Sequence, residues 1–486
     1  MSVIFHSLDK RTDADAPLVE ELHPSLDAWE VAQRLAGCSH LLLLDSAQSH
    51  PTHGRYSFVT ADPFEWIESR GNSVTISGRK QRACNPFDVL VERLAGYRIS
   101  SHPDLPPFQG GAAGLFGYDL CHHIERLPRP AVDEFQTPEM AGGLYDWVIA
   151  FDHVANRSWL ISTGLPETNL RLRREKAGER LRQIQQLLRR DPPPVMETLG
   201  RPISVSCSHP VPGQSLLASN FTRDSYLAAG RRAIEYIHAG DCFQVNLAQR
   251  LLYPQREHPL ELYGRLRDRN SAPFAGYFDM GEFVVASASP ERFLAVKDRQ
   301  VETRPIKGTR PRGWNPEEDF ARMDDLLESA KDRAENVMIV DLLRNDLGRV
   351  CEYGSIHVDG LCRIESFRTV HHLVSEVRGR LRQGLGPIDL LKAAFPGGSV
   401  TGAPKVRAME IIAELEPTAR GPYCGSLGYI GFDGTMDTNI LIRTFTVGKG
   451  WVQFPVGGGI VADSVPEREY EETWHKAEGL LQALEN

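Results

Sequence analysis

The sequence has no apolar run long enough to cross a membrane, and its few cysteines form no recognisable motif. The amino terminus, MSVIFHSLDKRTDADAP, turns charged after three apolar residues, and no later stretch approaches the length of a membrane span. The eight cysteines are scattered, with no CxxC pair and no clustered Cys/His spacing of the kind that binds a metal. We therefore expect reduced thiols in a soluble, cytoplasmic protein.

An excess of positive charge is also lacking. The chain has 55 Lys and Arg residues against 64 Asp and Glu residues, which gives a formal net charge of −9. A general nucleic-acid surface or anionic-membrane surface is therefore not expected, and any anionic ligand must be bound by a local basic pocket. The content of apolar residues, 41%, is typical of a soluble globular protein, and 486 residues favour two domains.

The pattern of short strands and helices divides the chain into two halves. Residues 26–165 contain short strand-like runs separated by turns, followed by an arginine-rich helix at about 167–190. A stretch rich in Pro and Ser then ends the periodic pattern. We predict an amino-terminal domain at 1–205, a linker at 206–219 and a second domain at 220–486. Antiparallel strands with segregated helices indicate an α+β architecture.

Three helix boundaries in the second half can be predicted from capping residues. Thr222 is a plausible N-cap for the first helix. Asn315 and Pro316 open a long helical region that is either two helices or one helix with a break. Before the last helix, Ser464-Val-Pro-Glu467 matches a capping-box sequence.

Acidic side chains recur three residues apart at two places. Glu469 and Glu472 share a face of the last helix, where Lys476 follows at i+4, and Asp332 and Glu335 precede the apolar run VMIVDLL. The commoner explanation for each pair is a solvated helix face. If the two pairs converge, however, they could hold Mg²⁺, which prefers oxygen ligands.

Further candidates for a site come from a turn, two glycine-rich runs and two basic residues. Glu291 lies in a turn between apolar strands, where burial would raise its pKa and suit it to general acid catalysis. The runs PGGSVTGAPK (396–405) and VGGGIV (456–461) could present backbone N–H groups to an anion, although glycines usually serve turns. Arg443, on an otherwise apolar strand, needs an anionic partner. His372 is equally compatible with a site donor and a core histidine.

The stretch RPIKGTRPRG, residues 304–313, contains a single lysine, Lys307, among three arginines. A nucleophilic lysine must be neutral, and burial together with the cationic Arg304, Arg310 and Arg312 could depress its pKa. Most lysines, however, are exposed solvating charges. The residues alone indicate an anion pocket, a candidate Mg²⁺ site and a candidate amine.

Taken in order, a set of motifs resembles the chorismate-utilising enzymes. The motifs are FQVNLAQ, SASPERF, RPIKGTRPRG, KDRAENVMIVDLLRNDLG, HHLVSEVRG, FPGGSVTGAPKVRAMEII, LIRTF and GGGIVADSVPEREYEET. The resemblance is dense in the second half and continues more thinly into the first. It implies two interleaved α+β parts, in which two large antiparallel β-sheets pack face to face with helices outside.

The resemblance also assigns roles to individual residues. It implies Mg²⁺ as the cofactor, with Glu335 and Glu472 as its principal ligands and Asp332 and Glu469 as nearby partners. Glu291 matches the general acid that assists departure of the ring hydroxyl. The groups that hold the substrate chorismate match Arg443, Tyr423, Lys476, the amides of Gly457, Gly458 and Gly459, and the pocket-lining His372 and Ser399.

Two positions separate the branches of this family. Members that add water carry a base lysine on the strand written here FQVNLAQ, whereas this chain has Gln244, so ammonia is the expected nucleophile. Anthranilate synthases read PIAGT where this chain reads PIKGT, with Lys307. The chain is therefore most similar to the aminodeoxychorismate synthase component I group. In that group a lysine adds to chorismate as hydroxide leaves, and ammonia then displaces it.

The resemblance implies partners and leaves rivals open. The sequence contains no recognisable glutaminase motif, so ammonia is expected from a separate glutamine amidotransferase subunit or from free ammonium, and the pathway implied is that to 4-aminobenzoate and folate. The nearest alternative is an anthranilate synthase component I. A rival of another class is a silent regulatory module that binds an aromatic amino acid.

LLLLDSA and NSAPF resemble segments that form a tryptophan pocket in relatives, which points to Ser46, Pro273 and Phe274. These segments also depart from the family's pattern, at Asp45 and at residues 272–274. Whether tryptophan is bound therefore stays open.

Overall fold

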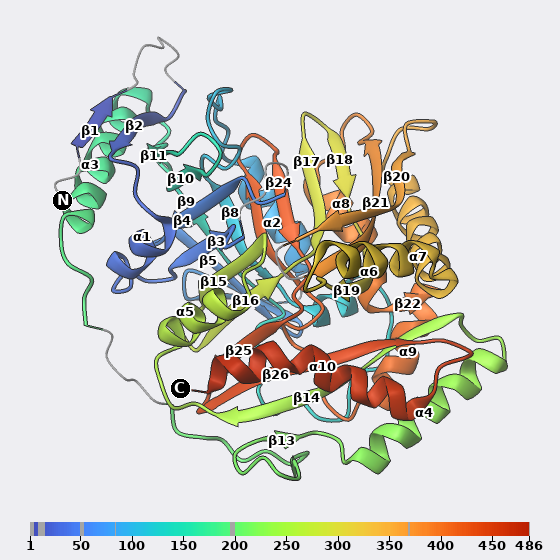
Figure 1. Ribbon diagram of the computed structural model, residues 1–486. Helices are drawn as coiled ribbons and strands as arrows, with labels where there is room; N and C mark the ends of the chain where they lie inside the picture. Colours follow the sequence, from blue (N-terminus) through green and yellow to red (C-terminus); the bar gives the residue numbers. More distant parts are fainter. Residues whose placement is uncertain are drawn as a thin grey trace.

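The computed structural model describes residues 4–7, 15–48, 53–82, 84–194, 200–367 and 370–485. Across these residues the strands form two antiparallel sheets, and helices cover the sheets (Figure 1). This confirms the predicted α+β fold. No helix in the described ranges is long and apolar enough to cross a membrane.

The first sheet has 14 strands within the described chain. Its strands follow one another in space in the order β1 (Ile4–Ser7), β2 (Leu18–His23), β11 (Arg157–Ser162), β10 (Trp147–Asp152), β4 (Tyr56–Thr60), β3 (Leu42–Asp45), β15 (Phe274–Asp279), β16 (Phe283–Ser289), β25 (Thr444–Gly448), β26 (Trp451–Ile460), β14 (Gln244–Pro254), β13 (Ala218–Ser219) and β12 (His209–Pro210), with β22 (Gly402–Ala403) also paired to β14.

The second sheet has 12 strands in the same part of the chain. Their order is β19 (Ile306–Pro311), β21 (Val370–Arg380), β18 (Gln300–Thr303), β17 (Arg292–Lys297), β24 (Met436–Asn439), β23 (Ser426–Gly431), β8 (Gly111–Phe116), β9 (Met140–Tyr145), β5 (Glu65–Arg70), β6 (Ser73–Ile76) and β7 (Arg79–Arg82), with β20 (His357–Ser366) paired to β21.

Both sheets take strands from both halves of the sequence. In the first sheet β3 pairs with β15, and in the second β8 pairs with β23. Strands from before residue 205 and strands from after residue 220 therefore lie in the same sheets. The predicted linker contains the short strands β12 and β13, which form an antiparallel hairpin that extends the first sheet beyond β14.

A layer of apolar side chains lies between the two sheets. Phe58 of the first sheet contacts Tyr429 of the second with ring centroids 5.6 Å apart, and Trp66 of the second contacts Phe278 of the first at 5.8 Å. These contacts belong to a buried cluster with members in both sheets. Burial of this surface is the main favourable term that holds the sheets together.

Helices pack on the outer faces of the sheets. They are α1 (Ala28–Arg34), α2 (Pro86–Ala95), α3 (Leu170–Leu188), α4 (Arg223–His238), α5 (Pro259–Arg269), α6 (Pro316–Glu328), α7 (Ala330–Gly348), α8 (Pro387–Ala394), α9 (Lys405–Leu415) and α10 (Pro466–Leu484), with 3₁₀ turns η1 (Tyr118–His123) and η2 (Gly398–Val400). Helix α10 crosses β26, and α7 packs on β19 and β21 (Figure 1).

The helix boundaries confirm two predictions and correct a third. Thr222 caps α4 in a capping box with Ser225, and the long helical region breaks at Ser329, which caps α7. The capping box predicted before α10 is wrong. Pro466 takes the first helical position and makes Val465 the N-cap, while the Ser464 hydroxyl donates to the Glu469 carboxylate at 2.7 Å.

Candidate active site

Lys307, Glu291 and Ser399, which we call the catalytic cluster, come from three separate elements. Lys307 lies in β19, Glu291 in the turn between β16 and β17, and Ser399 in η2. The Ser399 hydroxyl donates to Glu291 Oε1 at 2.9 Å, and Lys307 Nζ donates to the Ser399 carbonyl oxygen at 3.2 Å. A single serine therefore holds both the amine and the carboxyl group.

Burial shifts the pKa of both ionisable members of this cluster. Burial raises the pKa of Glu291 to about 7, although the Ser399 hydroxyl and the charge of Lys307 act against the shift. Burial also lowers the pKa of Lys307, against the opposing charges of Glu335 and Glu291. A protonated acid and a neutral amine are the states that proton donation and nucleophilic attack require.

The strand that carries Lys307 is irregular at this point. The register of β19 on β21 shifts between Ile306 and Thr309 within the strand. Gly308 has a φ of +80°, and a Cβ there would lie 2.9 Å from the Asp332 side chain. Only glycine accommodates both the left-handed backbone and the close approach of α7.

The arginines around Lys307 do not act as predicted. Arg304 pairs with Glu365 and Glu376, and Arg312 pairs with Asp319 at 2.7 Å. Arg310 pairs with Asp325 at 2.6 Å and with Asp332 at 3.2 Å. Because these cations are neutralised by carboxylates, burial is the main cause of the lowered pKa of Lys307, and the positive neighbour that adds to it is Lys476.

The acidic residues predicted to converge come from α7 and α10. A Cβ built at Gly458 of β26 would lie 3.4 Å from Glu472 Oε1 and 3.5 Å from Glu469 Oε2. Burial raises the pKa of Glu335, and the charge of Glu472 contributes to the rise. The carboxylates of Glu335, Glu469 and Glu472 are therefore electrostatic neighbours, and we call these three residues the carboxylate set.

Two lysines lie among the carboxylate set. Lys476 Nζ is 2.6 Å from Glu472 and donates to the Gly457 carbonyl oxygen at 2.9 Å, whereas Lys331 Nζ is 3.9 Å from Glu335. Burial acts to raise the pKa of Glu472, but the charge and hydrogen bond of Lys476 hold it below its usual value. Lys331 was missed in the sequence, although its i,i+4 spacing to Glu335 is a usable signal.

In the part of the chain that the structure describes, no three His, Cys, Asp or Glu side chains form a group that could hold a metal. Asp332 turns its carboxylate to Arg310. The carboxylate oxygens of Glu335, Glu469 and Glu472 are nevertheless the donor type that a hard cation prefers, and the charges of these groups act on one another. The predicted ligand set remains a prediction.

Arg443 lies close enough to His372, a residue of β21, for its charge to lower the pKa of that histidine. Arg443 precedes β25 with a φ of +52°, and thus lies in a turn where a strand was expected. Over the described residues its buried guanidinium has no ion-pair or hydrogen-bond partner, and burial lowers its pKa. His372 Nδ1 is bonded to the Thr309 hydroxyl at 2.8 Å, and burial lowers the pKa of His372 to about 3, with Arg443 as the next contributor. A neutral imidazole beside an unpaired guanidinium suits an anionic ligand.

Gln244 begins β14, where it pairs with Ala403 of β22, while Asn246 of the same strand pairs with Gly459 of β26. Gln244 is fully buried, and neither its amide nitrogen nor its amide oxygen has a hydrogen-bond partner. A Cβ at Gly459 would lie 2.6 Å from the Gln244 amide nitrogen. Such an unsatisfied amide is costly to bury and is available to a ligand.

The residues predicted for a tryptophan pocket do come together. Ser46, Pro273 and Phe274 line one cavity of about 370 Å³ between the sheets. The Ser46 hydroxyl lies 3.4 Å from the Pro273 carbonyl oxygen, and Asn439 donates to the Phe274 carbonyl oxygen at 2.9 Å. Asp45 is occupied by Arg267 at 2.7 Å and by the Tyr263 hydroxyl at 2.9 Å.

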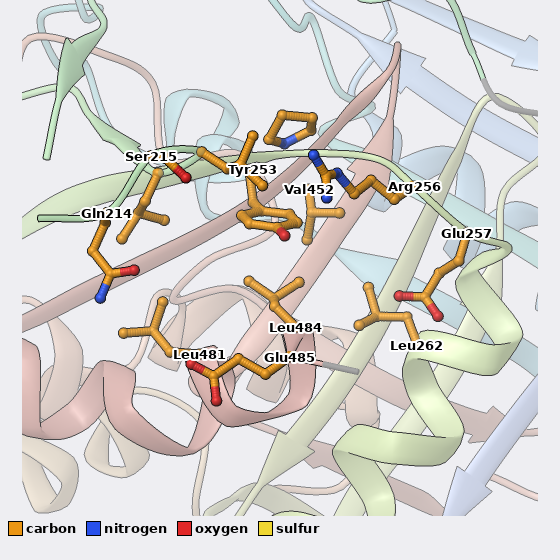
Figure 2. Close-up of a pocket in the computed structure, with 13 residues that line it drawn as sticks. Gln214, Ser215, Tyr253, Arg256, Glu257, Leu262, Val452, Leu481, Leu484 and Glu485 are labelled. Carbon is orange, nitrogen blue, oxygen red and sulfur yellow. The ribbon is translucent and has the colours of Figure 1, made fainter.

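A second cavity of about 370 Å³ contains none of the predicted residues. It lies between the carboxyl end of α10, α5 and the end of β14, and Leu481, Leu484 and Glu485 face Tyr253 and Val452 across it (Figure 2). It is therefore separate from the catalytic cluster.

Comparison with known proteins identifies the family to which the chain is similar. A family model described as "chorismate binding enzyme" matches residues 45–482. The chain is 43% identical to anthranilate synthase component 1 of Thermus thermophilus, over 91% of this chain and 92% of that protein. It is 41% identical to aminodeoxychorismate synthase component 1 of Escherichia coli, over 93% and 95% of the two chains.

A solved structure agrees with these sequence matches. Anthranilate synthase component I of Streptococcus pneumoniae superposes with a TM-score of 0.74 and 33% identity, over 89% of this chain and 92% of that one. The fold, the extent of the match and the identity to the two relatives lead to one conclusion. This chain belongs to the chorismate binding enzyme family.

Proposed function

We propose that this enzyme aminates chorismate with ammonia to give 4-amino-4-deoxychorismate, a precursor of 4-aminobenzoate and folate. Overall identity does not select the activity, because the chain is about as similar to an anthranilate synthase component as to an aminodeoxychorismate synthase component. The observation that carries the proposal is Lys307, whose amine is bonded to Ser399 next to a buried Glu291. That geometry suits covalent catalysis, for which an alanine at this position would provide no nucleophile.

We assign substrate binding to a guanidinium, an imidazole and a group of donors around β26. Arg443 supplies a buried guanidinium for a carboxylate, and neutral His372 adds a hydrogen-bonding group beside it. Lys476 and the backbone of Gly457 to Gly459 line the other side of the site, and we assign them, with the buried Tyr423, to the second carboxylate and the enolpyruvyl group.

The reaction then proceeds as two displacements. Neutral Lys307 Nζ forms a C–N bond at the far end of the allylic system while the C–O bond to the ring hydroxyl breaks, and Glu291 gives its proton to the departing oxygen, which leaves as water. Ammonia then forms a C–N bond at the vacated carbon while the bond to the positively charged Lys307 nitrogen breaks, and the electron pair of that bond returns to the nitrogen and regenerates the neutral amine. The new ammonium group of the product gives one proton to the Glu291 carboxylate, which restores the acid. The net change is chorismate plus ammonia to aminodeoxychorismate plus water.

Mg²⁺ is the cofactor that the carboxylate set would hold. Glu335 and Glu472 are the proposed principal ligands, with Glu469 and Asp332 as further candidates. When bound, the ion would supply positive charge for a substrate carboxylate. In its absence Lys331 and Lys476 provide the counter-charge to the same carboxylates, so the protein balances this charge with its own residues.

Gln244 bears on the choice of nucleophile. An amide has no basic group to activate water, but its free oxygen can accept a hydrogen bond from ammonia and its nitrogen can donate one to the substrate. We propose that ammonia comes from a glutamine amidotransferase subunit, as the component names of the relatives suggest, or from free ammonium.

The decisive experiment is incubation of the protein with chorismate, Mg²⁺ and ammonium, with product identification by chromatography and mass spectrometry. Aminodeoxychorismate that requires an added lyase to become 4-aminobenzoate would support the proposal. Prompt anthranilate fluorescence without a lyase would assign the chain to the alternative activity.

We also propose that the cavity lined by Ser46, Pro273 and Phe274 binds tryptophan. The specific observation is a cavity of about 370 Å³ in which these three residues meet, within the size range of small-molecule sites. Calorimetric titration with tryptophan, performed alongside turnover measurements, tests binding and regulation separately. Binding without any turnover of chorismate would instead favour a silent regulatory module.

A further inference from the structure

A buried ion pair binds Val400, the residue that follows Ser399 of the catalytic cluster. Glu416, which follows α9, pairs with Arg420 through two hydrogen bonds of 2.7 and 2.9 Å. The two residues are 5% and 6% exposed. We call them the Glu416–Arg420 pair.

The pair ties together backbone segments that are far apart in sequence. Arg420 donates to the carbonyl oxygens of Val400 at 3.0 Å and Asn246 at 2.9 Å. Glu416 accepts a hydrogen bond from the Ala248 amide at 2.9 Å. The pair thus fixes η2 relative to β14. Arg420 binds Val400 of η2 and Asn246 of β14, and Glu416 binds Ala248 of β14.

The same guanidinium also packs between aromatic rings. Its carbon lies 4.8 Å from the ring of Tyr118 and 5.7 Å from the ring of Tyr423. Tyr423 is one of the residues assigned to the substrate. The pair therefore contacts a substrate-site residue as well as the turn that contains Ser399.

Val400 follows Ser399 directly, and this links the Glu416–Arg420 pair to the catalytic cluster. Ser399 accepts from Lys307 through its carbonyl group and donates to Glu291 through its hydroxyl group. A displacement of η2 would therefore move the hydrogen-bond partners of both the amine and the acid. Displacements of about 1 Å near a reacting centre can lower rates by about 100-fold.

Stability alone gives little reason for a buried ion pair. Desolvation of two charges commonly offsets their attraction, and apolar replacements of the same volume are often as stable. Here three of the five polar side-chain atoms, Arg420 Nη1 and Nη2 and Glu416 Oε1, each hold a separate backbone group. Geometric specificity accounts for that arrangement better than a net gain in folding free energy.

We propose that the Glu416–Arg420 pair is a positioning device that sets the place of Ser399 and, through it, of Lys307 and Glu291. Its catalytic consequence rests on the proposed function. The pair touches neither of these two side chains, so its residues are positioning residues.

The test compares Arg420→Lys with a matched control, Arg250→Lys. Arg250 is also a buried arginine paired with a glutamate, Glu134 at 3.2 Å, but it holds no segment of the catalytic cluster. We expect Arg420→Lys to lower kcat for ammonium-dependent amination about 10- to 100-fold with KM for chorismate changed less than about 3-fold. Arg250→Lys should leave both within about 2-fold, at a comparable loss in Tm.

A second variant, Glu416→Gln, tests the proposal even if Arg420→Lys does not fold. Glu416→Gln keeps the shape of the side chain and removes only its charge, and it should lower kcat in the same way. Combination with Ser399→Ala should be strongly non-additive, because both changes would act on the hydrogen bond from the Ser399 hydroxyl to Glu291. Full additivity, or an equal kcat for the Arg420 and Arg250 variants, would overturn the proposal.

Hydrogen exchange separates this proposal from the proposed function. Exchange of the backbone amides of residues 398–401 should be faster in Arg420→Lys than in Arg250→Lys, whatever reaction the enzyme catalyses. If the parent chain fails to aminate chorismate but this difference is found, the proposed function fails and the positioning role stands. Unchanged exchange in both Arg420→Lys and Glu416→Gln would refute the positioning role itself.

Discussion

Burial lowers the pKa of Lys307 and raises the pKa of Glu291, in each case toward the uncharged form. The lysine shares one serine with the acid, and its amine is screened from the arginines that flank it in sequence because those arginines are paired. Burial is therefore the main cause of both pKa shifts, and the flanking arginines contribute little to the lowered pKa of Lys307.

The first prediction at this scale concerns the amine. Lys307→Ala should lower aminodeoxychorismate formation by at least about 100-fold, since a group that bonds to the substrate is lost. Folding should be retained because the side chain makes a single hydrogen bond to a backbone oxygen. Steady-state kinetics and circular dichroism measure the two effects. Undiminished turnover would exclude a covalent role.

The second prediction concerns pH. Glu291 must be protonated to act as an acid, and its pKa is raised to about 7, so kcat should fall as pH rises through about 7. The groups that face it are the Ser399 hydroxyl, the Lys307 amine, the Ile306 amide and the Cys424 thiol. Ser399→Ala removes an interaction that lowers the pKa, and should therefore move this limb of the profile to higher pH. A limb that stays in place would show that another group titrates.

The third prediction concerns the metal. Glu472→Gln removes one proposed ligand and also the partner of Lys476, and should raise the Mg²⁺ concentration needed for half-maximal activity. Glu471 is a neighbour on α10 that is exposed, and Glu471→Gln serves as the control. Mg²⁺ titration of amination measures the change, and identical titrations for both variants would remove Glu472 from the ligand set.

At the scale of elements, one residue, Ser329, caps the amino-terminal end of helix α7. Ser329 ends α6 and accepts a hydrogen bond from the Asp332 amide as the N-cap of α7, which carries Glu335. Ser329→Ala should cost about 1 kcal/mol of stability, and Ser329→Asp should restore most of it. Urea denaturation and hydrogen exchange in the first turn of α7 measure the effect. Equal stability of the Ala and Asp variants would show that the cap contributes nothing.

Elements with a strong local signal could be predicted from the sequence, and the others could not. Thr222 and the arginine-rich helix were recognisable because a cap and a 3.6-residue period are local properties. The start of α10 was mispredicted because Pro466 determines the N-cap more strongly than the Ser464 motif. Arg443 was placed in a strand because its left-handed backbone leaves no mark in the residue pattern.

The candidate site was predictable as a set of residues but its contacts were not. Ser399 is 92 residues from Lys307 and 108 residues from Glu291 in the sequence, and only the fold brings the three together. Arg304, Arg310 and Arg312 pair with acids from other elements, so of the two expected causes of the lowered Lys307 pKa only burial remains. The Glu416–Arg420 pair gave no sequence signal beyond an ordinary i,i+4 spacing.

At the scale of the whole molecule, neither half of the sequence can complete a sheet. Separate expression of 1–205 and 220–486 should give aggregated or poorly ordered chains, because β15 would lose β3 and β23 would lose β8. Size-exclusion chromatography and near-ultraviolet circular dichroism test this, with the intact chain as control. A monomeric 220–486 fragment with native-like signals would show that the second half is an independent folding unit.

Helix α10, which carries Glu469, Glu472 and Lys476, also has a consequence during translation. It is synthesised after every other element that contributes to the site, because η2, β19 and α7 all precede it. A ribosome-bound nascent chain, or one shortened by a premature stop before this helix, would therefore contain Lys307, Glu291 and Glu335 without Glu469, Glu472 and Lys476. Catalytic competence is thus acquired in a single late event, and incomplete products of protein synthesis are expected to be inert toward the substrate.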